Sequence, residues 1–289
     1  MSGDKHEPAY RLARALLRPT LQLLTRRDWR GQENLPRAGG CLVVANHLSH
    51  ADPLTLAHFI DDAGRAPRFL GKAELFTLPV IGRIVSGAGQ IPVYRETVDA
   101  AKALGAAISA VNDGECVVIY PEATLTRDPQ LWPMVGKTGA ARVAQATGCP
   151  VIPVGQWGPQ AILAPYRRIP RPLPRRLIHV WAGAPIDLSQ TFGLANSRPA
   201  SDMAVEVGLT ADVGMTADVG LTPDVGLTPD VGLTPAALRA ATAKIMSAIV
   251  AILEEIRGVP APRDRFDPRS HQLPLMGDPR RHGLPEQGR

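Results

Sequence analysis

The sequence has few cysteines and few aromatic residues. Its three cysteines, Cys41, Cys116 and Cys149, are odd in number, show no CxxC spacing and lie in apolar runs. We therefore expect buried thiols in a reducing compartment and not a disulfide framework. Aromatic residues make up 4% of the chain and are not interleaved with the basic patches, which argues against a nucleic-acid partner.

Long apolar runs are also lacking. The first ten residues are polar and show no signal-peptide pattern, and the longest uncharged stretch, residues 143–166, contains four prolines that disfavour a membrane-spanning helix. With 45% hydrophobic and 20% charged residues, the composition is that of a globular protein with a sizeable core. We expect it at the cytoplasmic face of the cell membrane, as a peripheral or monotopic protein.

Residues 1–30 are predicted to be a membrane-associating segment. From 11 to 30 they include six arginines and one aspartate, and Arg11, Arg14 and Arg18 recur at helical spacing opposite a stripe of leucines. This pattern predicts a basic amphipathic helix that binds an anionic membrane surface. A surface helix packed on its own domain fits the pattern equally well.

Residues 31–193 are predicted to form one α/β domain with a mixed, largely parallel sheet flanked by helices. Short apolar runs typical of buried strands alternate with helical patterns at 97–111 and 138–147. The runs are 41–46, 68–71, 90–94, 116–121, 150–155 and 177–182.

The chain changes character after this domain. Within 194–235, a six-residue motif of the type VGLTPD repeats from Val207. The period is similar to that of a parallel β-helix, but five copies complete fewer than two coils, so a flexible insertion is favoured. We expect residues 236–258 to be a helix that packs on the domain. We expect 259–289 to be a disordered tail or a segment wrapped on the surface.

The segment VVANHLSHADP carries the strongest chemical signal. A buried strand delivers Asn46 and His47 to its carboxyl end, and Asp52 follows five residues after the histidine. In a regular helix these two side chains would point about 140° apart, so they meet only if a turn intervenes. Asp52 followed by Pro53 is a typical helix start, with Asp52 as the N-cap. A carboxylate held there can also orient the imidazole as a general base.

The string NHLSHAD resembles the Asn-His-x-x-x-x-Asp signature of the PlsC-like 1-acylglycerol-3-phosphate acyltransferases, the glycerolipid acyltransferase family. Three further blocks follow in that family's order: GAGQIPVYR at 87–95, VVIYPEATLTRD at 117–128 and VIPV at 151–154. The third block departs from the family's Pro-Glu-Gly-Thr-Arg-Ser pattern. Ala123 replaces the glycine, so a backbone conformation with positive φ is expected to be lost, and the arginine is displaced to Arg127.

The resemblance implies transfer of a fatty acyl group to the free hydroxyl of a lysophospholipid, most simply 1-acylglycerol-3-phosphate giving phosphatidic acid. The donor is acyl-CoA or acyl carrier protein, and no cofactor is expected. His47 deprotonates the hydroxyl and Asp52 orients the imidazole. The predicted substrate-binding residues are Asn46, Lys72, Arg95, Glu122, Thr124 and Arg127, among which Arg95 is expected to bind the acceptor phosphate.

Two other functions are compatible with parts of the sequence. His47, His50, Asp52 and His58 offer ligands for a metal-dependent hydrolase, although their spacing is not that of a typical zinc site. The basic helix, the arginine- and proline-rich segment at 167–176 and the repeats are compatible with a non-catalytic module that binds anionic membranes.

Overall fold

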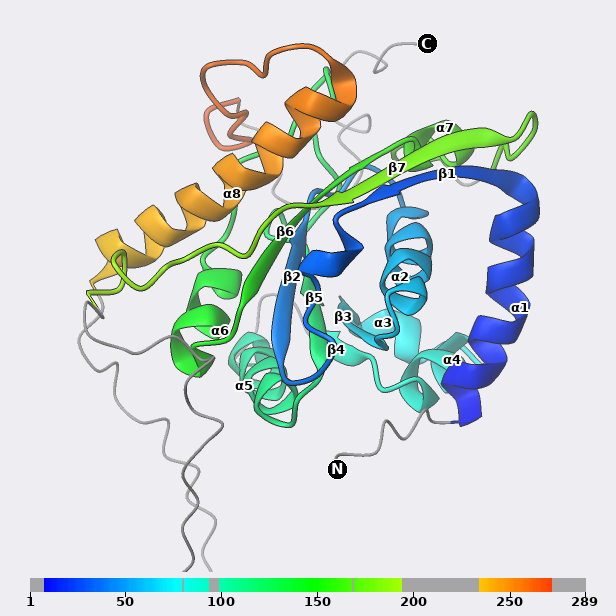
Figure 1. Ribbon diagram of the computed structural model, residues 1–289, viewed down its shortest axis with the longest axis horizontal. Helices are drawn as coiled ribbons and strands as arrows, with labels where there is room; N and C mark the ends of the chain where they lie inside the picture. Colours follow the sequence, from blue (N-terminus) through cyan, green and yellow to red (C-terminus); the bar gives the residue numbers. More distant parts are fainter. Residues whose placement is uncertain (1–7, 80, 94–98, 168, 194–233, 272–289) are drawn as a thin grey trace, which may run out of the picture.

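A seven-stranded sheet lies at the centre of the computed structural model, which describes residues 8–79, 81–93, 99–167, 169–193 and 234–271 (Figure 1). The strand order is β1-β7-β6-β2-β5-β3-β4. All neighbouring pairs are parallel except β6 and β7, which confirms the predicted mixed, largely parallel sheet. The strands are β1 (Thr25–Arg30), β2 (Cys41–Ala45), β3 (Pro67–Lys72), β4 (Ile91–Val93), β5 (Cys116–Ile119), β6 (Val151–Trp157) and β7 (Arg176–Ala182).

Six of these strands coincide with the apolar runs, whereas β1 was not predicted. Residues Thr25–Arg30 were expected to continue the amino-terminal helix, but they pair in parallel with β7 at the edge of the sheet. An edge strand tolerates charged side chains because one of its sides is not covered by another strand, so its sequence lacks the apolar signature. The α/β domain therefore begins at residue 25 and not at residue 31.

Helices cover both faces of the sheet. Helices α5, α6 and α8 pack on one face, while α2 packs on the other and α1 lies outside α2 (Figure 1). The helices are α1 (Pro8–Leu24), α2 (Asp52–Asp62), α3 (Ala73–Phe76), α4 (Ile81–Gly87), α5 (Asp99–Asn112), α6 (Gly139–Thr147), α7 (Pro159–Ile162) and α8 (Pro235–Arg257), with a 3-10 turn at Gln32–Asn34.

Helix α8 is long and apolar enough to cross a membrane by length and composition. Its apolar side nevertheless faces the sheet, where Ile245, Ile249 and Leu253 are fully buried. Gly155 on β6 allows this close packing, because a Cβ atom there would lie 2.6 Å from Ile252 Cγ2. The predicted helix at 236–258 is thus a core helix of the domain.

The described part of the predicted tail, residues 259–271, is wrapped on the domain and is not disordered. Val135 N donates a hydrogen bond to Phe266 O at 3.1 Å, and Ala261 N donates to Glu254 Oε1 at 2.7 Å. Residues 272–289 and most of the predicted insertion, 194–233, lie outside the described residues.

Candidate active site

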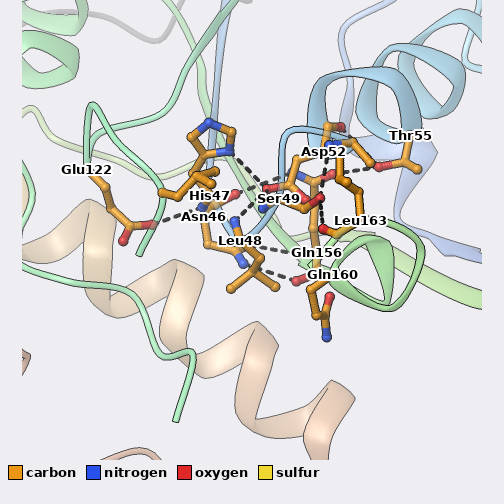
Figure 2. A network of polar contacts seen from close by, with 12 residues as sticks. Asn46, His47, Leu48, Ser49, Asp52, Thr55, Glu122, Gln156, Gln160 and Leu163 are labelled. Atoms are coloured by element: carbon orange, nitrogen blue, oxygen red, sulfur yellow. Dashed lines mark hydrogen bonds and ion pairs between the residues drawn. The ribbon is translucent and has the colours of Figure 1, made fainter. Parts of the chain in front are cut away.

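The imidazole of His47 and the carboxylate of Asp52 form a hydrogen-bonded pair where β2 ends. All five residues of β2 are buried, and the chain then turns through residues 46–51 before α2 begins. His47 Nδ1 lies 2.9 Å from Asp52 Oδ2 (Figure 2). The turn brings the two side chains together across a separation at which a continuous helix would point them apart.

Asp52 is fixed by the turn itself. Its Oδ2 atom also accepts hydrogen bonds from Leu48 N at 2.5 Å and Ser49 N at 2.8 Å, and the side chain has no exposed surface. The N-cap position of α2 is occupied by Ala51, so the expectation that Asp52 caps this helix is wrong. Its carboxylate binds the preceding backbone instead, and those two N–H donors hold it beside the imidazole.

The surroundings of His47 select its tautomer and ring plane. Because a carboxylate accepts the Nδ1 proton, the neutral ring carries its lone pair on Nε2. The ring stacks on Tyr120 with centroids 4.2 Å apart and planes 17° apart. The side chain is 16% exposed, which leaves access for one reacting group. A histidine held in this way is suited to accept a proton from a hydroxyl.

The backbone of His47 is clamped by the segment that follows β5. His47 N donates to Glu122 Oε1 at 2.9 Å, and Thr126 N donates to His47 O at 2.7 Å. The other Glu122 oxygen accepts from Met134 N at 3.0 Å. Figure 2 shows Glu122 and Asp52 approaching His47 from opposite sides. Burial raises the pKa of Glu122 to about 8, although these two backbone N–H groups oppose the rise.

Asn46 is also a structural neighbour of the histidine. Its amide exchanges two hydrogen bonds with the backbone of Gln156 at the end of β6, at 3.0 and 2.8 Å. The side chain of Gln156 in turn accepts from Thr55 Oγ1 on α2 at 3.2 Å. Asn46 thereby extends the pairing of β2 with β6 by one residue and fixes the point at which His47 leaves the sheet.

A cavity of 2570 Å³ opens beside His47. Apolar side chains from α1, α3 and α4, among them Leu17, Leu75 and Ile84, line it, and Asp61 is the one acidic residue among the described lining residues. The arginines and lysines among the described lining residues are Arg14, Arg18, Lys72, Lys137, Arg142, Arg167, Arg171 and Arg176. An apolar cavity with a basic rim suits a ligand that has a hydrocarbon part and an anionic part.

The predicted substrate-binding residues fall into three groups. Lys72 and Thr124 line the cavity. Asn46, Glu122 and Arg127 do not line it, and they are 0%, 3% and 1% exposed. The first two hold the backbone around His47, whereas Arg127 lies inside the domain, so the structure does not bring these three to a substrate. Arg95 lies outside the described residues.

Ala123 does not lose the conformation that glycine favours. Its φ is 57°, so the alanine adopts the left-handed backbone region, and the expectation of a lost positive φ is wrong. The turn after β5 is enforced by its hydrogen bonds, including Ala123 N to Tyr120 O at 2.9 Å. A left-handed alanine costs roughly 1–2 kcal/mol.

The ligand set weighed for a metal-dependent hydrolase is not assembled. Within the described ranges, no three or more histidine, cysteine, aspartate or glutamate side chains are grouped so that they could hold a metal ion. His58 is buried, and its ring centroid lies 4.7 Å from that of Trp29. Both His50 and His58 line the cavity. Burial, followed by the charges of His47 and Lys72, lowers the pKa of His50.

Three residues around His47 were missed by the sequence analysis. Tyr120 stacks on the ring, Thr126 binds its carbonyl oxygen, and Gln156 binds Asn46. Tyr120 and Gln156 stand at the ends of β5 and β6, the two neighbours of β2. Because the carboxyl ends of parallel strands meet at one edge, this position was the available signal.

Together, the sheet and the site define an α/β protein in which a histidine–aspartate pair faces an apolar, basic-rimmed cavity at the carboxyl ends of parallel strands. Residues 26–157 match the family model described as Acyltransferase. This match agrees with the resemblance drawn from the motifs of the chain.

Individual relatives match about half of the chain. A chloroplastic 1-acyl-sn-glycerol-3-phosphate acyltransferase of Brassica napus is 34% identical over 138 residues, which is 47% of this chain and 38% of that protein. A Bacillus subtilis protein of the same name is 29% identical over 133 residues, 45% of this chain and 62% of that protein. The chain therefore spans less than two thirds of the length of these relatives.

A solved structure supports the fold. The crystal structure of the 1-acyl-sn-glycerophosphate acyltransferase PlsC from Thermotoga maritima matches with a TM-score of 0.50 and 24% identity. The match covers 61% of this chain and 68% of that chain. At this identity the likeness concerns the fold alone.

Proposed function

We propose that the chain transfers a fatty acyl group from a thioester donor to the free hydroxyl of a lysophospholipid. The observation that carries the proposal is the 2.9 Å contact between His47 Nδ1 and Asp52 Oδ2 beside the cavity. The names of the relatives support 1-acylglycerol-3-phosphate as the acceptor. The product is then phosphatidic acid, an intermediate of phospholipid biosynthesis.

In the proposed mechanism, His47 Nε2 takes the proton from the acceptor hydroxyl as its oxygen attacks the thioester carbonyl. Asp52 stabilises the imidazolium, and hydrogen bonds from Leu48 N and Ser49 N already fix the position of its carboxylate. When the tetrahedral intermediate collapses, the C–S bond breaks and the imidazolium returns its proton to the leaving thiolate. The neutral imidazole is thereby restored, and no covalent enzyme intermediate forms.

The rim of the cavity supports anionic substrates. Lys72 and Thr124 line it near His47, and the resemblance assigns Arg95 to the acceptor phosphate. The phosphates of acyl-CoA or the acidic surface of acyl carrier protein would be attracted by the arginines at 167–176. The apolar walls provide room for the acyl chain.

We also propose that α1 binds an anionic membrane surface at the cytoplasmic face of the cell membrane. Leu12, Leu16 and Leu23 on α1 are 57%, 61% and 72% exposed. They form a stripe on one side of the helix, opposite the side that contacts the domain. Insertion of such a stripe into the lipid would place the cavity next to the membrane that holds its acceptor.

The test uses the purified full chain with acyl-CoA and 1-acylglycerol-3-phosphate, and follows thiol release together with phosphatidic acid formation. We expect equal amounts of both products. His47→Ala should lower kcat by about 10²–10⁴-fold because the general base is removed. Asp52→Asn should lower it by a similar factor because the amide no longer selects the Nδ1–H tautomer.

Controls separate this proposal from its alternatives. His179→Ala removes a histidine on β7 that pairs with Asp28 and does not line the cavity, so the correctly folded variant should retain its rate. Acceptors with and without a phosphate test the head group, and acyl carrier protein tests the donor. If the wild type transfers no acyl group to any of these acceptors from either donor, the proposal is wrong. If His47→Ala keeps the full rate, His47 is not the base.

A further inference from the structure

Helix α8 lies outside the residues matched by the acyltransferase family model, yet its last residue contacts the loops that support the site. The guanidinium carbon of Arg257 is 3.8 Å from the ring centroid of Trp132 and 4.3 Å from that of Trp157. Arg257 Nη2 also donates to Gln130 O at 3.0 Å. One planar cation therefore joins two tryptophans from different segments of the domain.

The Trp132 contact leads to the backbone of His47. Trp132 O accepts from Thr126 Oγ1 at 2.6 Å, and Thr126 N donates to His47 O at 2.7 Å. Two residues after Trp132, Met134 N holds the Glu122 carboxylate that accepts from His47 N. Both backbone hydrogen bonds of His47 are thus made by the segment on which Arg257 stacks.

Trp157 is linked to the chain at His47 through its neighbour on β6. Trp157 is the last residue of β6, and its neighbour Gln156 exchanges two hydrogen bonds with the Asn46 amide. Asn46 directly precedes His47 in the chain. Arg257 consequently ties together the two segments that fix the residue pair Asn46–His47.

The segment from Pro121 to Met134 is held by contacts with the rest of the domain. It contains no helix or strand, and Ala123 and Leu131 both have positive φ, at 57° and 63°. Irregular segments of this kind open more easily than helices or strands. Trp132 is only 3% exposed, so stacking of Arg257 on its ring takes place in surroundings where a cation–aromatic contact is stronger than at the surface.

From these contacts we propose that Arg257 is a positioning residue for the transfer reaction, holding the 121–134 segment and β6 so that His47 keeps its alignment with Asp52. The inference rests on the proposed acyl transfer. It assigns a role in the site to α8, which follows the repeat-containing insertion, and it attributes that role to the planar shape of the guanidinium as well as to its charge.

Arg257→Leu and Arg257→Lys test the proposal. We expect Arg257→Leu to lower kcat by about 10–100-fold while both KM values change less than about threefold, because misplacement of a catalytic group affects the chemical step. Arg257→Lys keeps the charge, but its ammonium group cannot stack as a plane on two rings. Its kcat should therefore lie between the kcat of wild type and that of Arg257→Leu. Thermal unfolding of each variant establishes the temperature at which it is fully folded for the assay.

A second measurement does not depend on activity. In NMR spectra of the full chain labelled in its histidine rings, the Nδ1 proton shared with Asp52 identifies His47, with His47→Gln for assignment. Arg257→Leu should shift or broaden this signal. If the wild type proves inactive, the NMR measurement still tests the alignment of His47 with Asp52. Failure of the acyltransferase proposal can therefore be distinguished from failure of the positioning proposal.

Lys244→Gln is the matched control on the same helix. Lys244 Nζ donates to Asp187 O at 2.6 Å, a contact of α8 far from His47 in the network. We expect wild-type kcat and an unchanged His47 signal. The proposal is overturned if folded Arg257→Leu keeps the wild-type kcat and the wild-type His47 signal. It is also overturned if Lys244→Gln lowers kcat as much as Arg257→Leu does.

Discussion

Two carboxyl groups contact His47, and their surroundings give them different properties. Asp52 accepts the ring proton and two backbone N–H bonds on one oxygen. Glu122 accepts one backbone N–H on each oxygen, and burial raises its pKa to about 8. The carboxyl group of Asp52 acts on the imidazole, whereas that of Glu122 holds the backbone, so substitutions of the two should affect different measurements.

The raised pKa of Glu122 predicts that the stability of the fold depends on pH. Its folded pKa of about 8 lies above its ordinary value of 4.5, so the folded chain retains a proton that the unfolded chain has lost between these values. The resulting contribution to the free energy of unfolding is fully present below pH 4.5 and is lost as the pH rises toward 8. The slope is up to about 1.4 kcal/mol per pH unit. Urea unfolding from pH 5 to 8 should show a shallower decline in Glu122→Gln than in wild type.

At pH 5 the same variant should be less stable than wild type by about 1–3 kcal/mol, because the amide nitrogen cannot accept one of the two backbone N–H bonds. Glu255→Gln, an exposed substitution on α8, should follow the wild-type curve. Parallel wild-type and Glu122→Gln curves across this pH range would contradict the raised pKa.

Ala123→Gly should stabilise the chain. At φ 57° glycine avoids the Cβ strain, and after its larger unfolded-state entropy is subtracted the gain should be about 0.5–1 kcal/mol. Ala240→Gly, at an exposed position inside α8, should instead destabilise by about 1 kcal/mol. Equal losses in unfolding free energy for the two variants would show that the left-handed alanine is not strained.

At the scale of elements, α1 is held to α2 by its arginines. Arg14 Nε donates to Asp61 at 2.8 Å and Arg18 Nη2 pairs with Asp62 at 2.6 Å, while Tyr10 donates to Asp61 at 3.0 Å. The sequence was compatible with a helix that binds a membrane and with a helix that packs on its own domain. Arg14 and Arg18 face the domain, and the leucine stripe lies on the outer side of the helix.

This arrangement predicts which side chains bind a membrane. Replacing Leu12, Leu16 and Leu23 together by Asn should reduce co-sedimentation with vesicles of phosphatidylglycerol and phosphatidylcholine at least tenfold, since each inserted leucine contributes roughly 1.5–3 kcal/mol. Val259→Asn, at a position that is 48% exposed beyond α8, should leave binding unchanged. Unaltered binding by the triple variant would exclude the stripe as the contact.

Strands were predictable where they are buried on both faces. Residues such as Val43 and Val118 lie in apolar runs because helices cover both sides of β2 and β5. β1 escaped prediction because its sequence, TRRDWR, belongs to a sheet edge. There, pairing with β7 outweighs a local pattern that continues the amphipathic helix.

Only the local part of the site was predictable from the sequence. His47 and Asp52 are five residues apart, so one motif contains both. Glu122, Gln156 and Arg257 reach the same point from positions 75 to 210 residues further along the chain. Their roles depend on strand order and on helix docking, which no spacing in the sequence records.

The prediction that the repeat belongs to a flexible insertion can be tested by deletion. Deleting residues 207–230 should change kcat/KM less than about threefold, because the described contacts of the site come from other residues. The remaining linker can still span up to about 50 Å, and shortening it changes the closure free energy by about 1 kcal/mol or less. A shuffled repeat of equal length is the control. Loss of folding on deletion would show that the repeat is structural.

Helix α8 is held to the sheet by buried side chains such as Ile245, Ile249 and Leu253 and by the close approach at Gly155. Its place is set by this packing and not by the chain that leads to it. Two separately expressed pieces, one ending and one beginning within the repeat, should therefore reassemble into a working whole.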